Sequence, residues 1–449
     1  MNDKVDETTT NPVLRCSFCG IEKSVSVPLI AGNDGHICEH CVKLAYQVVN
    51  SWGRRAVISQ PDLKAPGVIK KYLDEYIIGQ DDAKKTLSVA LYNHYLRLHN
   101  SGEQQPFSTN PDTEVVEVEK SNVLMTGPSG TGKTLLVKTL SRIIGVPFVI
   151  GDATSLTQAG YVGQDVESLL KRLLEASDWN VQQAEWGIVY IDEIDKLAKR
   201  GDGGTAVRDI SGEGVQQALL KMIEGAEVRV PKGGQRDHGE EVTLNTQNIL
   251  FIVGGAFPGL MELVSKRLQP PQAGIGFNAP LKKDCEFSNN ELLAALQPDD
   301  LQGFGLIPEF IGRFPIVTFL QELDVPALER ILREPKNALT KQYRRLFSYQ
   351  NVELNFTDDS VRFIAEQAVQ RGTGARGLRA LMETTLCEIM FELPTIVGLK
   401  SCEVVVAGEG EEAHLEVVQH FGASDGSAVE PESREPVTEM DARESAASL

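Results

Sequence analysis

The chain has 449 residues, a formal net charge of −19 and a sequence pI of about 4.9, with 41% hydrophobic and 24% charged residues. This composition is ordinary for a globular protein of roughly two to three domains, and its acidity argues against broad binding to nucleic-acid phosphates. No run reaches the ~20 apolar residues of a membrane-spanning helix, and no apolar core follows a basic start at the amino terminus. We therefore expect a cytoplasmic protein that binds neither membranes nor nucleic acid.

The first segment is rich in cysteine. Residues 1–11 are expected to be disordered and residues 12–50 to form a zinc-binding domain. Four of the seven cysteines fall in two Cys-x₂-Cys pairs with eighteen residues between the pairs: Cys16, Cys19, Cys38 and Cys41. Two such pairs let four thiolates surround one Zn²⁺, and the metal supplies folding free energy that so short a segment lacks. Two disulfides are the alternative, although they are rare in the cytoplasm. His36 and His40 are expected to be bystanders.

Residues 51–65 have mixed polarity and are expected to be a linker. Apolar residues at helical spacing follow between Pro66 and Asn100, and a polar surface loop comes next. From residue 121 to about residue 320, short apolar runs alternate with helical patterns, which is typical of a parallel α/β sheet. We therefore predict an α/β domain over residues 66–320.

The strongest motif begins where the apolar run Val123–Met125 ends, and a helical pattern follows it. It reads G-x-x-x-x-G-K-T and comprises Gly127, Pro128, Ser129, Gly130, Thr131, Gly132, Lys133 and Thr134. The glycines allow backbone N–H groups to wrap phosphate oxygens, and the helix N-terminus adds a favourable dipole. Lys133 adds positive charge and Thr134 offers a hydroxyl to Mg²⁺. The motif predicts an ATP–Mg²⁺ site.

A second apolar run, Ile188–Ile191, predicts a buried strand that ends in Asp192 and Glu193. Asp192 is placed to hold Mg²⁺ through water, and Glu193 can polarise the attacking water. The pair indicates hydrolysis rather than binding alone. Asp195 is expected to lie in a solvated acidic turn. A third run, Asn248–Phe257, predicts another central strand, and because it ends in Gly-Gly-Ala we assign no polar γ-phosphate sensor to it.

Residues 321–408 carry apolar side chains mainly at helical spacing, and one short β-like segment closes them. They are expected to form a small, mainly helical domain. Residues 409–449 are acidic and rich in Ser, Ala and Pro, and are expected to be a disordered tail. The three cysteines outside the zinc pairs are expected to be small core residues: Cys285, Cys387 and Cys402.

Taken together, the chain resembles the ClpX family, the AAA+ unfoldase subunits of the bacterial Clp protease. The resemblance runs from Cys16 to about Leu393 and rests on the nucleotide motifs and on five further segments: DEYIIGQDDAKKTLSVALYNHY, AGYVGQDVESLL, RDISGEGVQQALLKMIEG, PEFIGRFP and GTGARGLR. It implies an α/β AAA+ P-loop domain with a parallel sheet, a small helical C-terminal domain and an N-terminal zinc-binding domain. It also implies a homo-hexamer that uses ATP, Mg²⁺ and Zn²⁺, unfolds tagged proteins and delivers them to the ClpP peptidase.

The resemblance assigns further residues to the nucleotide site. Tyr76, Ile77 and Ile78 would line the adenine pocket. Arg313 would be the arginine finger that reaches the γ-phosphate bound by a neighbouring subunit, and Arg376 would be the sensor-2 arginine of the small domain. Arginine suits both roles because its charge is permanent and its donors form a planar fork.

Three glycine-bearing loops would contact the translocating polypeptide. Their candidate contacts are Tyr161, Val162, Arg208, Asp209, Arg236 and His238. Gly160 and Gly163 would be the hinges of the first loop. Gln164 stands where the family has an acidic residue, and Asp237 stands where the entrance loop has lysine. The loss of that positive charge leaves the preference for substrate tails open.

A further stretch would dock on ClpP through Ile275, Gly276 and Phe277, because exposed Ile and Phe are unfavourable unless a partner pocket receives them. In the family the zinc domain dimerises and docks adaptors and some substrates, and the unfoldase also acts as a protease-independent chaperone. We identify no protease triad. The alternatives are an HslU-type unfoldase, a remodelling ATPase not coupled to a peptidase, and a nucleic-acid motor or clamp loader. The cysteine pairs and the docking loop argue against HslU, and acidity argues against a nucleic-acid motor.

Overall fold

The computed structural model describes residues 14–24, 27–32, 35–53, 61, 63–100, 118–157, 164–198, 212–232, 241–268, 287–408 and 410–421. The chain forms two compact units, Met1–Asp62 and Leu63–Leu449. Within the described ranges, no helix is both long and apolar enough to cross a membrane.

The N-terminal unit is a short β-hairpin followed by a helix. Strands β1 (Leu29–Ala31) and β2 (His36–Cys38) are antiparallel, and α1 (Glu39–Gly53) begins directly after β2. Helix α1 therefore crosses the domain boundary that we expected at residue 50.

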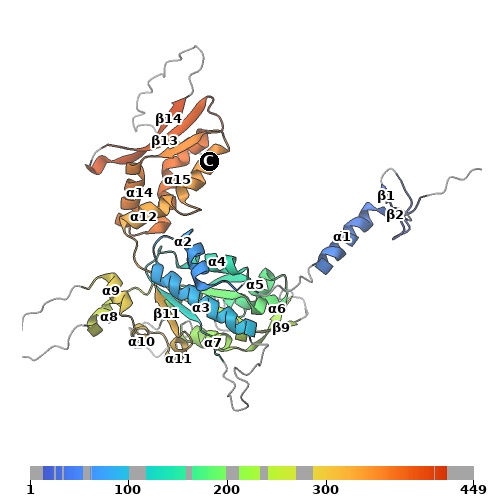
Figure 1. The fold of residues 1–449 in the computed structure, drawn as a ribbon, viewed down its shortest axis with the longest axis horizontal. Helices are drawn as coiled ribbons and strands as arrows, with labels where there is room; N and C mark the ends of the chain where they lie inside the picture. Colours follow the sequence, from blue (N-terminus) through green and yellow to red (C-terminus); the bar gives the residue numbers. More distant parts are fainter. Residues whose placement is uncertain are drawn as a thin grey trace, which may run out of the picture. The chain divides into compact units, whose positions relative to one another are not determined.

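The second unit is built on a five-stranded parallel sheet, which confirms the predicted α/β fold (Figure 1). Its strands, in spatial order, are β11 (Ile316–Phe319), β3 (Val123–Thr126), β10 (Leu250–Gly255), β7 (Ile188–Asp192) and β4 (Phe148–Asp152). The three predicted apolar runs are the three central strands. Because parallel neighbours are buried on both sides, the strands read as continuous apolar sequence.

Helices cover both faces of this sheet, and successive strand residues point alternately to the two sides. Val123 and Met125 join a core with α2 (Pro66–Asp74), α3 (Asp81–Asn100) and α4 (Lys133–Ile144). Leu124 joins the opposite core with α5 (Ser168–Ala176), α7 (Glu213–Glu224) and α11 (Pro308–Gly312). The result is a three-layer α/β/α arrangement that fixes the carboxyl ends of β3, β10 and β7 beside one another.

Smaller elements decorate the sheet. They are three 3₁₀ helices (Ala153–Ser155, Ile194–Leu197, Thr246–Asn248), β5 (Leu156–Thr157), β6 (Gln164–Asp165), α6 (Val181–Glu185), β8 (Glu227–Pro231), β9 (Glu241–Asn245), α8 (Leu260–Leu268), α9 (Asn289–Ala294) and α10 (Pro298–Phe304). Strands β5 and β6 are parallel, whereas β8 and β9 form an antiparallel hairpin.

The C-terminal helical region has its own core and a small sheet. Its elements are α12 (Val325–Arg333), α13 (Leu339–Ser348), β12 (Glu353–Phe356), α14 (Asp358–Gln370), α15 (Ala375–Glu392), β13 (Leu399–Ala407), a 3₁₀ turn (Gly410–Glu412) and β14 (His414–Phe421). Side-chain caps define two of the helix starts: Asp324 accepts from Ala327 N–H and Thr357 accepts from Ser360 N–H.

Two expectations for this region were wrong. The tail does not begin at residue 409, because β14 pairs with β13, and Leu415 and Val417 pack on the core. The acidic residues around this strand hid its alternation of apolar and polar side chains. Cys387 is exposed on α15, whereas Cys402 is buried on β13 as expected. Cys285 lies outside the described residues.

Candidate zinc centre and nucleotide site

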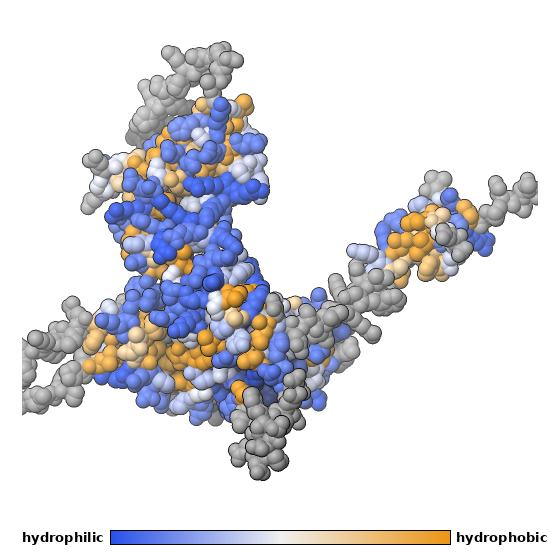
Figure 2. All heavy atoms as spheres, in the orientation of Figure 1, coloured by the Kyte–Doolittle hydropathy of each residue, from blue (hydrophilic) through white to orange (hydrophobic). Residues whose placement is uncertain are grey.

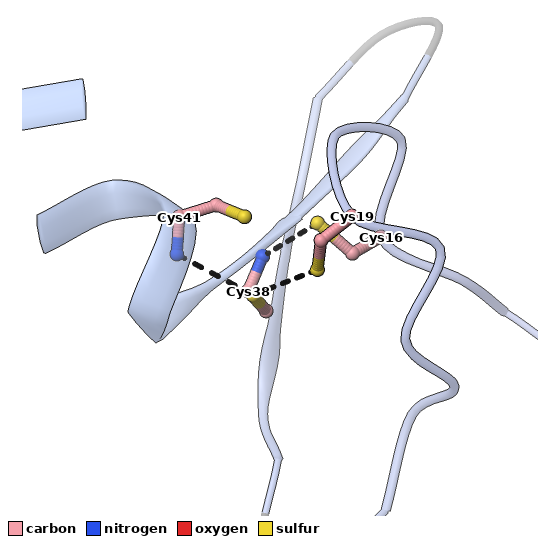
Figure 3. A group of neighbouring side chains, drawn as sticks. All are labelled: Cys16, Cys19, Cys38 and Cys41. Atoms are coloured by element: carbon pink, nitrogen blue, oxygen red, sulfur yellow. Dashed lines mark hydrogen bonds between the residues drawn. The ribbon is translucent and has the colours of Figure 1, made fainter. Parts of the chain in front are cut away.

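The four cysteine sulfurs of the N-terminal unit lie together (Figure 3). All four are free thiols within 4.8 Å of one another, and Cys19 Sγ is 3.6 Å from Cys38 Sγ. That separation excludes a disulfide and approaches the ~3.8 Å expected for two thiolates on one tetrahedral Zn²⁺ with Zn–S bonds of ~2.3 Å. The disulfide alternative is therefore wrong, and the ligand cluster contains neither His36 nor His40.

Local backbone geometry brings the two cysteine pairs together. Gly20 adopts a φ of 76°, and its N–H donates to Cys16 O at 2.8 Å, which closes a tight turn around the first pair. The second pair spans the junction of β2 and α1, where Cys41 N–H points to Cys38 Sγ at 3.5 Å. Cys38 N–H in turn lies 3.3 Å from Cys16 Sγ. Such N–H groups stabilise negative charge on sulfur.

The ionisation of the four thiols is uneven. The pKa of Cys16 is lowered to about 6: burial opposes ionisation, but backbone N–H groups, that of Cys19 foremost, outweigh it. The pKa of Cys41 is raised to about 12, chiefly by the Cys19 thiol and by burial. Crowded sulfurs cannot all be negative without a cation between them. The donor set therefore fits a structural Zn²⁺, which would be held by all four cysteines.

In the second unit, the phosphate-loop motif joins the end of β3 to α4. Gly132 has a φ of 99° and is the N-cap of α4, so Lys133 is the first helical residue. Lys133 is 8% exposed, and its Nζ donates to Gly127 O at 2.6 Å and Pro128 O at 2.9 Å. Burial lowers the pKa of Lys133, while the Asp192 carboxylate opposes this shift. A cationic group thus lies inside the loop, where phosphates would bind.

The second half of the site faces this loop across β10. Thr134 Oγ1, on α4, donates to Asp192 Oδ2 at 2.7 Å, although β10 separates β7, which ends in Asp192, from β3, which leads into the phosphate loop. Asp192 Oδ1 accepts from Glu193 N–H at 3.0 Å, and Glu193 has a left-handed φ of 58°. A non-glycine residue held in this conformation is typical of functional sites. A hydroxyl and a carboxylate therefore converge where Mg²⁺ would be held.

The expectation for Asp195 was wrong. Its side chain is not solvated: Asp195 is 6% exposed, and Oδ1 accepts from Ala256 N–H at 3.2 Å, just after β10. The glycines at the end of β10 fit this arrangement. A Cβ on Gly255 would lie 2.6 Å from Asp195 Oδ1, and one on Gly254 would overlap the Tyr190 hydroxyl. Asp195 thus fixes the end of β10 relative to the Asp192–Glu193 turn.

Three families match successive parts of the chain. Residues 14–51 match the ClpX C4-type zinc finger, residues 118–317 the AAA domain (Cdc48 subfamily), and residues 323–405 the C-terminal, D2-small domain of ClpB protein. The ATP-dependent Clp protease ATP-binding subunit ClpX of Azotobacter vinelandii is 60% identical over 431 residues, which cover 95% of this chain and 97% of the relative. This chain belongs to the ClpX family.

Other ClpX relatives agree. ClpX 3 of Methylococcus capsulatus is 55% identical, with 87% of this chain and 91% of the relative covered. ClpX of Bacteroides thetaiotaomicron is 46% identical, with 85% and 91% covered. The chain is accordingly an AAA ATPase with an ATP-binding domain and a C4 zinc site, and Mg²⁺ is typical of such ATPases.

The arginines that the ClpX resemblance singled out lie in two different surroundings. Arg376, near the start of α15, donates from Nη1 to Ser129 Oγ of the phosphate loop at 3.1 Å. A Cβ on Gly130 would lie 2.8 Å from Thr373 O, so this segment packs tightly on the loop. Arg313 follows α11, and its guanidinium is paired with Glu224 at the end of α7 rather than with the phosphate loop.

The segment of the proposed adenine pocket is tied to the C-terminal helical region. Ile77 and Ile78 are 6% and 7% exposed, and Tyr76 is half-buried with Lys336 Nζ 5.9 Å from its ring centroid. Two residues further on, Gln80 makes a reciprocal pair with Gln321: Nε2 donates to Gln321 O at 2.8 Å, and Oε1 accepts from Gln321 N–H at 2.7 Å. Sequence reasoning missed this link because 241 positions separate the partners.

The substrate-loop and docking residues lie outside the described residues. These are Tyr161, Val162, Arg208, Asp209, Arg236, His238, Ile275, Gly276 and Phe277. Their neighbours in sequence are described: β5 and β6 flank the first loop, α7 follows the second, the β8–β9 hairpin brackets the third, and α8 and α9 flank the docking stretch. The roles of all nine residues stay predictions.

Proposed function

We propose that this ATPase is a cytoplasmic homo-hexameric unfoldase and translocase that pulls tagged proteins through an axial pore into ClpP. The observation that carries the proposal is the arrangement of Thr134, Asp192 and Glu193 beside the phosphate loop, with Arg376 of the C-terminal helical region on the same loop. A site that joins hydrolytic groups to a second helical region suits a motor in which nucleotide state changes the relation between two parts of the chain.

Bound ATP–Mg²⁺ supplies the phosphoanhydride bond whose hydrolysis releases the free energy for unfolding. Lys133 and the loop N–H groups would bind the phosphates, and Thr134 and Asp192 would hold the metal. Glu193 orients the attacking water and accepts its proton. Arg376 would contact the nucleotide bound by its own chain, and Arg313 would complete the site of the neighbouring subunit.

On the substrate side, Tyr161 and Val162 grip the polypeptide, and the two later loops select and hold it. Asp237 in place of a lysine lowers the positive charge near Arg236 and His238. We infer weaker recognition of carboxylate-ended tails than a lysine-bearing loop provides. The Ile275–Phe277 stretch docks on ClpP, which supplies the peptidase activity.

The N-terminal unit serves in dimerisation and in docking adaptors. It carries apolar side chains that are 39–74% exposed on a very small body (Figure 2): Leu14, Phe18, Ile21, Ile30, Leu44 and Tyr46. So many exposed apolar groups are unfavourable in water unless another surface covers them. The ClpX C4-type zinc finger match supports the same assignment.

The proposal is tested by ATP-dependent degradation of a tagged, stably folded protein with and without ClpP. Glu193→Gln should bind ATP but neither hydrolyse it nor unfold the substrate. Deleting Ile275 to Phe277 should abolish degradation while ATPase and unfolding remain. If the intact chain unfolds substrate but ClpP never degrades it, the chain is a remodelling ATPase. If Glu193→Gln unfolds at the normal rate, the hydrolytic assignment fails.

A further inference from the structure

Helix α7 packs against α11 in one apolar core, and two sets of side-chain hydrogen bonds also link the two segments; Figure 1 shows the helices side by side. The first contact is Gln216, whose side chain is fully buried. Its Nε2 donates to Leu197 O at 2.7 Å, and its Oε1 accepts from Ile307 N–H at 2.9 Å. Leu197 ends the turn that follows the hydrolytic pair, and Ile307 is the N-cap of α11. One side chain therefore ties that turn to the start of the helix that leads to Arg313.

The second contact is at the other end of α7, two helical turns further on. Arg313 Nε and Nη2 both donate to Glu224 Oε1, at 3.0 and 2.6 Å. The Arg313 and Glu224 side chains are 51% and 45% exposed, so the pair adds little to folding stability. It does fix the plane of the guanidinium. Glu224 pairs with only Nε and Nη2 of the five-donor guanidinium, so within the described residues Nη1 remains available to another acceptor.

We propose that α7 positions the arginine finger: Gln216 sets where α11 begins, and Glu224 orients the Arg313 guanidinium toward the neighbouring subunit. The inference rests on the proposed trans role of Arg313. Glu224 and Gln216 are positioning residues, since both act through Arg313 or its helix. The opposing possibility is that Glu224 competes with the neighbour's γ-phosphate for Arg313, and that possibility predicts the reverse effect on rate.

The first experiment replaces Glu224 at the surface, where folding is not at risk. Glu224→Ala should lower kcat for ATP about three- to five-fold, the scale of one exposed ion pair, and leave ATP affinity within about two-fold. Glu224→Gln keeps an Oε1 acceptor in the same place and should restore most of the rate. Glu227→Ala, which removes an exposed carboxylate on the adjacent strand β8, is the matched control. Faster hydrolysis in both Glu224 variants would overturn positioning in favour of competition.

Mixed rings then show where the defect acts. A chain carrying Glu193→Gln is expected to hydrolyse no ATP, so a second change in that chain can be detected only at its neighbours' sites. Rings of wild type mixed with Glu193→Gln/Glu224→Ala should turn over more slowly than rings mixed with Glu193→Gln alone. Equal rates would mean that Glu224 affects only its own subunit, and the inference would be wrong.

Two further variants separate the possible failures. Gln216→Met removes both buried hydrogen bonds at nearly constant volume, and Gln217→Met alters the exposed neighbour as its control. We expect only Gln216→Met to give the same trans defect in mixed rings. Arg313→Ala should abolish hydrolysis. If Arg313→Ala still hydrolyses ATP, the assignment of Arg313 as the finger fails. If Arg313→Ala is inactive but Glu224→Ala and Gln216→Met have no effect, only the role of α7 fails.

Discussion

Replacing Gln80 with Ala should loosen the link between the proposed adenine segment and the C-terminal helical region. Gln80 is 5% exposed and exchanges two hydrogen bonds with Gln321. Because Gln321 is exposed, water can replace the Gln80 side chain as its hydrogen-bond partner. The loss of each hydrogen bond therefore costs only its net contribution to stability, about 1 kcal/mol. A loss of about 2 kcal/mol lowers the protection of the Gln321 amide against hydrogen exchange about 30-fold, because 1.4 kcal/mol is a factor of ten.

A glycine at the same position separates hydrogen bonding from backbone strain. Gln80 has a φ of 59°, in the left-handed region that costs a side-chain-bearing residue about 1–2 kcal/mol. Gln80→Gly loses the same hydrogen bonds as Gln80→Ala but relieves this strain, so it should be the less damaging change by about 1 kcal/mol. Lys336→Met is a control for the nearby Lys336–Glu75 pair, which is exposed and should contribute at most about 1 kcal/mol.

The assay is hydrogen–deuterium exchange with mass spectrometry on the full-length chain, followed at the peptide that contains Gln321. The expected order of protection is wild type, Lys336→Met, Gln80→Gly and then Gln80→Ala. Protection in Gln80→Ala above that of Lys336→Met would refute the weight given to the buried amide. Protection in Gln80→Gly below that of Gln80→Ala would refute the strain argument.

Three further predictions concern the metal sites and pH. Thr134→Val should abolish ATP hydrolysis and Thr134→Ser should retain it, because only a hydroxyl can reach both Asp192 and Mg²⁺. Equal activity of the two variants in a phosphate-release assay would contradict this. Cys41→Ser should release zinc at lower chelator concentration than wild type, as measured by metal content, whereas exposed Cys387→Ser should not. The pKa of His94 is lowered to about 3 by burial and by the charges of Arg97 and Lys120. Between pH 3 and the unfolded-state pKa near 6.5, the unfolded chain therefore binds more protons than the folded chain, and the free energy of unfolding falls as pH falls. His94→Gln should remove this loss of stability, which is up to about 1.4 kcal/mol per pH unit below pH 6.5. Thermal melts at pH 7.5 and 5.5 measure it, and an equal shift of the melting temperature in wild type and His94→Gln would contradict the prediction.

The nucleotide motifs and the zinc ligands were predictable because their chemistry is local. A phosphate loop needs glycines, a lysine and a hydroxyl within eight residues, and a C4 zinc site needs two cysteine pairs. The parallel sheet followed from three apolar runs that a helix-forming pattern separates. The predicted roles of Arg313 and Arg376 came only from the family resemblance, because no local pattern marks them.

The contacts that organise the site were not predictable, because they join residues far apart in sequence. Asp195 looks like a surface acid in its own segment, and only the fold places Ala256 N–H against it. Glu224 meets Arg313 across 89 positions, and both are ordinary surface residues to a sequence pattern. The sequence of β14 was assigned to the tail because its charged residues outweighed its alternation of apolar and polar side chains. That alternation indicates a strand only when a partner such as β13 lies beside it.

The tight fit around the phosphate loop bears on how loss-of-function changes in it should be interpreted. A Cβ on Gly127 would lie 2.6 Å from Leu320 O, and one on Gly130 would lie 2.8 Å from Thr373 O. Both glycines thus face backbone: Leu320 lies in the segment that leads into the C-terminal helical region, and Thr373 lies between α14 and α15 of that region. Backbone cannot move aside as a flexible side chain can. The methyl group of an alanine at either position would push the phosphate loop and the facing backbone apart. An inactive glycine variant of this ATPase can therefore have its nucleotide still bound, with the movement of the C-terminal helical region blocked.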